Sequence, residues 1–190
     1  MMGTGADFHV TRRQVKRPTG EIGSRPRFPW GRFDGRVVAR WHDDGRDMTL
    51  VEPFAYVDPA RVRWLAPAGS VVNGASIPRP FWSLIGGPFE GRFRNASVVH
   101  DVACVERARP WRQVHRMFYE ACRCGRTNVL QAKIMYYAVY HFGPRWRLVG
   151  RSLRDETPPP PKPADVRRIV RYFETHDIDA DSIPDQPIPK

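Results

Sequence analysis

Two stretches of the chain, residues 73–82 (NGASIPRPFW) and residues 98–104 (VVHDVAC), decide its fold. The first contains two prolines, so it cannot form the interior of a helix, yet it is too apolar for a solvated loop. Because proline is favoured at the first position of a helix, residues 80–85 are expected to form one helical turn. The second stretch has helical spacing and sets His100 beside Asp101.

The Pro-rich stretch is therefore predicted to be an ordered loop rather than a linker. An Asn-Gly pair at its start is typical of a turn, and the two aromatic residues at its end are expected to anchor it on the helices that follow. This arrangement would hold Asn73 and Ser76 close to His100 and Asp101.

Periodicity on either side of the loop predicts an α+β fold. Residues 36–67 contain short alternating strands with an Asp-Gly turn at 43–45, which indicates a small antiparallel sheet. After the loop, residues of about 94–142 have the 3.6-residue period of helices, with short connections typical of antiparallel neighbours. The expected three-helix cluster comprises residues 94–107, 110–124 and 127–142.

Two side-chain patterns predict which faces are buried. In the last expected strand, Trp64 faces one side and Leu65 the other, because side chains alternate along a strand. In the first long helix, Val98, Val102 and Val105 are spaced to share one apolar stripe.

The composition outside this core suggests flexible ends. Residues 1–30 are basic and rich in Gly and Pro, so they are expected to form a flexible arm. A single α+β domain is expected over residues 31–150. Residues 151–162 include four consecutive prolines and are expected to form a stiff linker. A short helix of about 163–175 should follow, and the acidic segment up to residue 190 is expected to be disordered or to fold back on the basic body.

The charge balance points to anionic partners. The 190-residue chain has 31 Lys and Arg against 20 Asp and Glu, a net charge of +11. Such a surface favours nucleic acid, anionic lipid, an acidic cell-wall polymer or an acidic protein, while a GC-rich genome would also enrich arginine. No apolar stretch is long enough to span a membrane, and no signal peptide is visible. Three cysteines are a poor disulfide framework, which favours a reducing compartment.

The His-Asp pair has a chemical and a structural interpretation. In the first, His100 is a general base or metal ligand, since imidazole titrates near neutral pH, and Asp101 binds a metal or orients a partner. Ser76 is a weaker candidate nucleophile because it lacks the G-x-S-x-G context. In the second, His100 bonds to a neighbouring backbone and Asp101 pairs with Arg79 or Arg94.

The motifs taken together resemble a phage and prophage family, domain of unknown function 1353. The resemblance covers about residues 47–147. It rests on GASIP at 74–78, the His-Asp pair, the later helices containing QVHRMFYEAC and YYAVYHFG, and Trp146. The family has no secure reaction, so the resemblance implies a phage setting rather than a mechanism.

Two departures from the family pattern affect a metal site. Asn73 stands where the family usually has the aspartate before GAS, and His115 stands where it usually has an aspartate on the next helix. If those positions bind a metal, the ligands here would be Asn73, His100, Asp101 and His115. That set is less charged and would favour a transition metal over calcium.

Three functional hypotheses follow. The first is a phage- or prophage-associated hydrolase, metal-dependent or not, that acts on cell envelope or another polymer. The second is a non-catalytic virion component, such as a tail or head accessory protein, or an assembly protein, in which the His-Asp pair is structural. The third is a binder of nucleic acid or host protein through the basic surface. In each case the protein is expected to be made in the host cytoplasm, with packaging in virions or release by a lysis or secretion system left open.

Overall fold

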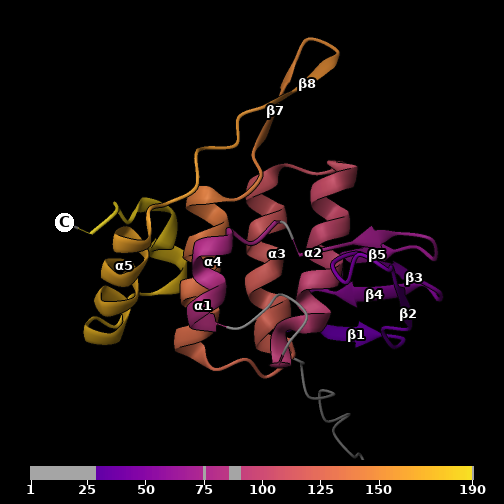
Figure 1. The fold of residues 1–190 in the computed structure, drawn as a ribbon, viewed down its shortest axis with the longest axis horizontal. Helices are drawn as coiled ribbons and strands as arrows, with labels where there is room; N and C mark the ends of the chain where they lie inside the picture. Colours follow the sequence, from indigo (N-terminus) through magenta and orange to yellow (C-terminus); the bar gives the residue numbers. More distant parts are fainter. Residues whose placement is uncertain (1–28, 75, 86–90, 190) are drawn as a thin grey trace, which may run out of the picture.

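The computed structural model describes residues 29–74, 76–85 and 91–189 of the chain. Its main elements lie side by side: two small sheets at one end, then helices α2, α3, α4 and α5 in a row (Figure 1). The fold class is α+β, as predicted. The four helices of this row are α2 (Arg94–Glu106), α3 (Trp111–Cys124), α4 (Val129–Phe142) and α5 (Pro163–Thr175).

The sheet region consists of two three-stranded antiparallel sheets. One has the order β1-β4-β5 and the other β2-β3-β6. In β5, Trp64 is buried and Leu65 is exposed, which confirms the predicted alternation. The strands are β1 (Arg32–Asp34), β2 (Ala39–Trp41), β3 (Met48–Leu50), β4 (Phe54–Val57), β5 (Arg63–Ala66) and β6 (Val71–Val72).

Helix α2 is the central element of the core. It packs against the strands β4, β5 and β6 on one side and against α3 on the other. Val98 and Val102 are buried as expected, but Val105 is 76% exposed, so its predicted place on the apolar stripe is wrong. Val105 lies in the last turn of α2, which ends at Arg107 in a left-handed conformation.

The next two helices are bounded by local signals. Helix α3 follows Pro110, and α4 begins after Asn128, whose side chain accepts a hydrogen bond of 2.7 Å from the backbone N–H of Gln131. After α3, a side chain at Gly125 would place its Cβ 2.5 Å from the carbonyl oxygen of Arg92. Glycine is therefore required there by the close approach of the segment before α2.

The described part of the Pro-rich loop, residues 73–74 and 76–85, packs on the body of the protein, as predicted. A 3-10 turn over Arg79–Phe81 leads into the short helix α1 (Trp82–Ile85). Phe81 is fully buried, and the indole N–H of Trp82 donates to the carbonyl of Ile77 at 3.0 Å. These contacts fix the end of the loop against the body of the protein.

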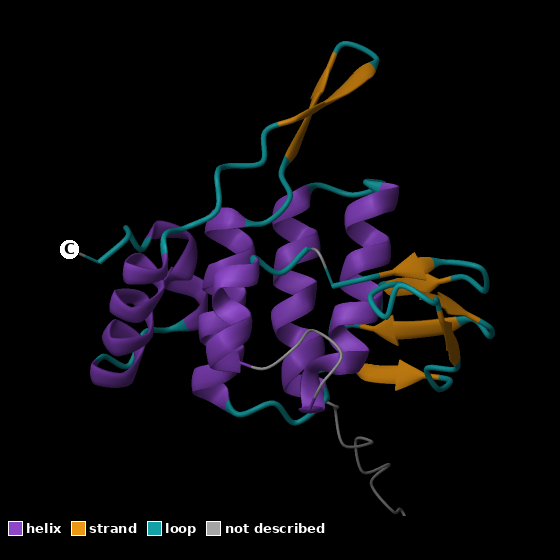
Figure 2. Cartoon of the chain, viewed as in Figure 1, coloured by secondary structure: helices purple, strands orange, loops and turns teal. Residues whose placement is uncertain are grey.

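The chain after α4 contains an element that the sequence analysis did not predict. Strands β7 (Trp146–Val149) and β8 (Ser152–Asp155) form an antiparallel hairpin that projects beyond the helices (Figure 2). The hairpin spans the boundary expected at residue 150, and its second strand takes up the first residues of the expected linker.

The acidic C-terminal segment folds back on the body. A 3-10 helix, η3 (Ala180–Asp185), packs against α4 with Ile183 fully buried. Asp181 pairs with Arg116 at 2.5 Å, and Asp177 pairs with Lys133 at 2.9 Å. Of the two alternatives for this segment, the structure has the ordered one.

Among the residues that the structure describes, no helix is long and apolar enough to cross a membrane.

The expected arm over residues 1–30 lies outside the described residues except for Pro29 and Trp30. The Trp30 ring packs edge-on against Tyr119, with ring centroids 5.8 Å apart.

Candidate functional site

Asp101 ties the Pro-rich loop to helix α2. Both of its carboxylate oxygens accept hydrogen bonds from the loop backbone: one from the N–H groups of Asn73 at 3.0 Å and Gly74, the other from the N–H of Ser76 at 3.4 Å. The Ser76 side chain adds a further hydrogen bond. The arginines Arg79 and Arg94, expected as partners if the pair is structural, are replaced by these backbone donors.

The local conformation of the loop makes this arrangement possible. Gly74 has a φ of 68°, which a residue with a side chain adopts only with strain. The resulting turn directs successive N–H groups toward one carboxylate. Asn73 contributes its backbone N–H to Asp101, and the residue itself is exposed.

His100 points away from Asp101, toward helix α3. Its Nε2 lies 2.9 Å from Nδ1 of His115, and Nε2 of His115 lies 3.0 Å from the carbonyl oxygen of Pro144. A carbonyl oxygen can only accept, so Nε2 of His115 carries the proton and its Nδ1 accepts from His100. The proton on His100 is therefore on Nε2, and both neutral tautomers are fixed by one backbone carbonyl.

This arrangement leaves one nitrogen of His100 unused. His100 is fully buried, and its Nδ1 has no hydrogen-bond partner. Such an unsatisfied buried atom costs about 1–3 kcal/mol. Nδ1 of His100 is thus an open acceptor in the protein interior.

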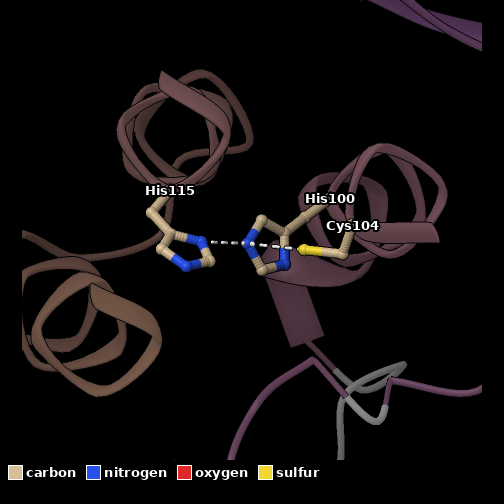
Figure 3. A group of neighbouring side chains, drawn as sticks. All are labelled: His100, Cys104 and His115. Carbon is tan, nitrogen blue, oxygen red and sulfur yellow. Dashed lines mark hydrogen bonds between the residues drawn. The ribbon is translucent and has the colours of Figure 1, made fainter. Parts of the chain in front are cut away.

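Cys104 completes a cluster with the two histidines. It lies one turn after His100 on α2, with its Sγ 3.7 Å from Nε2 of His100 (Figure 3). One ligand atom from each of His100, Cys104 and His115 lies within 4.8 Å of the others, and all three residues are buried. Ser76 lies between this cluster and the loop, since its side chain lowers the pKa of the Cys104 thiol as well as that of Asp101.

Burial controls the protonation of these groups. It lowers the pKa of His115 to about 3 and, together with the neighbouring His115, holds the pKa of His100 well below its usual value. Burial raises the pKa of Cys104, so the thiol stays protonated at neutral pH. Burial also raises the pKa of Asp101, while the hydrogen bonds from Ser76, Gly74 and Asn73 oppose that shift.

The cluster has some features of a metal site. A nitrogen and sulfur donor set suits zinc or copper, and the bond from His115 to Pro144 is the kind of outer contact that orients a ligating histidine. Tetrahedral zinc, with Zn–N of about 2.0–2.1 Å and Zn–S of about 2.3 Å, places N and S about 3.5 Å apart, close to the 3.7 Å between His100 and Cys104. Against this, metal binding at Nε2 would put a proton on Nδ1 of His100, where no acceptor lies.

The predicted site residues are thus divided between two neighbouring positions. Asp101 contacts Asn73 and Ser76 of the loop, as the sequence analysis expected, and His100 contacts His115. Of the four expected metal ligands, Asn73 and Asp101 lie on the loop side and are hydrogen-bonded to each other. They therefore do not form one metal site with His100 and His115.

Sequence reasoning undervalued one residue and missed another. Cys104 was not among the expected site residues, although its spacing of four residues after His100 places both on one face of α2. The contribution of Pro144 is a backbone carbonyl, which no sequence motif identifies.

The expected catalytic residues do not line either of two neighbouring hollows on the surface. These hollows, of about 240 and 400 Å³, share Trp64 and Arg109, whose guanidinium lies 4.9 Å from the Trp64 ring. Neither includes Ser76, His100 or Asp101. The polar cluster is therefore built into the interior rather than presented to these hollows.

Comparisons with known proteins give a match to a family of unknown function over part of the chain. Residues 48–139 match a family model described as "Protein of unknown function (DUF1353)", which supports the resemblance found in the sequence. An uncharacterized protein, y4jT, of Sinorhizobium fredii is 46% identical over 99 residues, which are 52% of this chain and 30% of y4jT. A second, y4iH, of the same strain is 37% identical over 103 residues, 54% of this chain and 43% of y4iH.

The matched part is less than half of either relative. The relatives therefore contain long regions that have no counterpart in the alignment with this chain. No solved structure matches the chain.

Proposed function

We propose that this DUF1353-like chain is a non-catalytic binding or assembly protein of phage or prophage origin. In this proposal the His-Asp pair is structural. The observation that carries it is that both carboxylate oxygens of Asp101 accept hydrogen bonds from the loop backbone. The carboxylate thus serves to hold the loop, and His100 contacts His115 instead of Asp101.

The position of His100 supports the same conclusion. A general base must come within hydrogen-bond reach of its substrate, but His100 is 0% exposed and its Nε2 is directed at His115. The phage or prophage origin rests on the resemblance of the GASIP and His-Asp motifs. A role as a tail, head or assembly component is consistent with a protein in which buried polar side chains stabilise the fold.

Replacing Asp101 with Asn tests the structural role. The carboxamide retains one acceptor oxygen but loses the second and the charge. We expect the free energy of unfolding to fall by about 2–4 kcal/mol, because a buried network is broken. The amides of Asn73, Gly74 and Ser76 should also exchange with solvent faster. Urea denaturation and amide hydrogen exchange by NMR measure these effects.

Asp43→Asn is the matched control, because Asp43 is exposed in the β2–β3 turn and the substitution is chemically the same. Its stability and loop exchange should match those of the unmodified protein. The proposal is wrong if Asp101→Asn leaves stability and loop exchange intact while it abolishes hydrolysis of peptidoglycan or another polymer.

A second candidate function is a metal-dependent hydrolase that acts on cell envelope or another polymer. The observation that favours it is the buried group of His100, Cys104 and His115. Zinc or copper is the expected ion. Because the three residues are buried, a bound ion would meet a substrate only if the loop of residues 73–78 moved.

Metal analysis of the purified protein separates the two candidates. A metal centre predicts one zinc or copper ion per chain, which is lost in Cys104→Ser and retained in Cys122→Ser. Cys122 is a suitable control because it is a buried cysteine outside the cluster. Cobalt substitution should give a sulfur-to-metal absorption band only with Cys104 present. Protein without stoichiometric metal, before and after zinc reconstitution, contradicts this second candidate.

A further inference from the structure

The β7–β8 hairpin is an exposed ribbon held at its base only. Trp146 is buried, whereas the other residues of both strands are exposed. The hairpin projects away from the helices in Figures 1 and 2. An isolated two-stranded hairpin is marginally stable in water. This hairpin is therefore stabilised by the contacts at its base or by a bound partner.

The charge on the ribbon suggests that such a partner is negatively charged. Arg147 and Arg154 are directly opposite each other in the two strands, and like charges in such positions are destabilising. Arg147 pairs with Glu156 at 2.6 Å, while Arg151 occupies the turn next to Gly150, which has a φ of 62°. An anion placed between the opposed arginines would remove their repulsion.

The base of the hairpin adds further arginines. The indole N–H of Trp146 donates to the carbonyl of Arg109 at 3.1 Å, and Arg107 pairs with Asp155 at 2.9 Å. Arg112 and Arg145 both lie over the ring of Trp111, at 4.5 and 4.8 Å from its centroid. These contacts gather the following residues, which we call the Arg-rich end: Arg107, Arg109, Arg112, Arg145, Arg147, Arg151 and Arg154.

Acidic side chains offset only part of this charge. Asp155 and Glu156 each pair with one arginine of the Arg-rich end, and Glu106 lies nearby in the chain. Asp58, Arg116 and Glu120 line the same hollow as Arg109 and Arg112. With them, eight arginines stand against five acids, an excess of three positive charges. Arginine is suited to phosphate because its planar guanidinium can donate two parallel hydrogen bonds.

We infer that the Arg-rich end binds double-stranded DNA, with the β7–β8 hairpin in the major groove. This inference names a partner for the proposed binding role and rests on it. The major groove of B-DNA admits a two-stranded ribbon and is about 8.5 Å deep. Strands of four residues extend about 13 Å at roughly 3.3 Å per residue, enough to reach the base edges.

The two faces of the ribbon fit different parts of such a groove. Arg147 and Arg154 share one face, and Leu148 and Leu153 pair on the other, 67% and 46% exposed. Arginines contact phosphates or guanine edges, and apolar side chains contact thymine methyl groups. Double-stranded RNA is a poorer fit because its major groove is narrow and deep. An acidic protein would satisfy the charge but gives no reason for a narrow projecting ribbon.

Binding of a fluorescent 25-base-pair DNA duplex to the full chain tests this inference. Fluorescence anisotropy would be measured over a range of salt concentrations with the unmodified protein and with Arg151→Ala/Arg154→Ala. We expect the affinity to fall steeply with salt, and each lost phosphate contact to reduce the slope of log K against log salt by about 0.9. The double variant should bind about tenfold or more weakly at moderate salt.

Arg36→Ala/Arg40→Ala is the matched control. It removes the same charge from exposed positions in the sheet region, outside the Arg-rich end. Thermal unfolding followed by circular dichroism checks that each variant is folded, and Arg151→Ala alone, in the exposed turn, replaces the double variant if that one is not. Polyglutamate is a competitor that represents an acidic protein.

Loss of DNA affinity in the hairpin variant but not in the control supports the inference. Equal losses in both variants would show general charge attraction and overturn it. So would the absence of DNA binding, or displacement of DNA by polyglutamate at an equal concentration of charge. These results would not affect the proposed structural role of the His-Asp pair, since Asp101→Asn tests that role separately.

Discussion

His100 and Asp101 are adjacent in the chain, but their side chains serve opposite neighbours of α2. Asp101 holds the loop that precedes the helix, and His100 contacts His115 on α3. Successive residues of a helix point about 100° apart, so an adjacent pair is suited to joining two neighbours rather than to forming one dyad. The carbonyl of Pro144 then determines which nitrogen of each histidine carries a proton.

The buried histidines predict how stability depends on pH. In the unfolded chain both side chains gain a proton below a pKa of about 6.5, whereas burial lowers the pKa of His100 and His115 in the folded protein. The unfolded state then binds more protons, so stability falls as pH drops through about 6.5 toward 3. We expect a loss of about 2–4 kcal/mol between pH 7 and pH 5.

Urea denaturation of chelator-treated protein at several pH values measures this dependence. His115→Gln removes one of the two groups and should reduce the slope by about half. A stability that is constant between pH 7 and pH 5 would contradict neutral, buried histidines at these positions.

Among the elements, the helices were predicted well and the hairpin was not. Helices α3 and α4 have apolar residues at helical spacing and clear boundary residues, so local sequence was sufficient. Strands β7 and β8 are exposed and charged, and each has four residues, so their apolar-polar alternation is too short to indicate a strand. Their pairing depends on the anchoring of Trp146, which is a tertiary contact.

The site was predictable to a similar degree. An Asn-Gly turn and a helix with a His-Asp pair indicated that loop and helix would meet, and Asp101 does accept from Asn73 and Ser76. The contact between His100 and His115 depends on how α2 packs against α3, and no spacing in the sequence specifies that. The same packing explains why Val105, beyond the contact region, is exposed.

The C-terminal element η3 gives a prediction at this scale. Ile183 is fully buried against α4, and Nε2 of His141 lies 3.0 Å from its carbonyl oxygen. Ile183→Ala should destabilise the protein by about 2–5 kcal/mol, because it removes buried methyl groups and leaves a cavity. Ile188→Ala, at a position that is 45% exposed, is the control and should have little effect. Equal urea midpoints for the two variants would show that η3 is not part of the cooperative fold.

In the whole molecule, the buried polar cluster and the charged surface have separate roles. The sheets, α2, α3 and α4 surround the cluster of His100, Cys104 and His115, which lies in the core. The hairpin projects from this core, whereas the acidic segment later in the chain folds back against α4. The fold thus combines a stable centre with peripheral elements that differ in charge.

The folded-back acidic segment changes where the positive charge is effective. Asp181 and Asp177 neutralise Arg116 and Lys133 on the helices, whereas Arg151 and Arg154 extend on the hairpin. The described residues are therefore expected to have an electric dipole moment whose positive pole is the hairpin. A long-range field of this kind orients a molecule before contact. We therefore expect the tip of the hairpin to be the first part of the protein that a polyanion contacts.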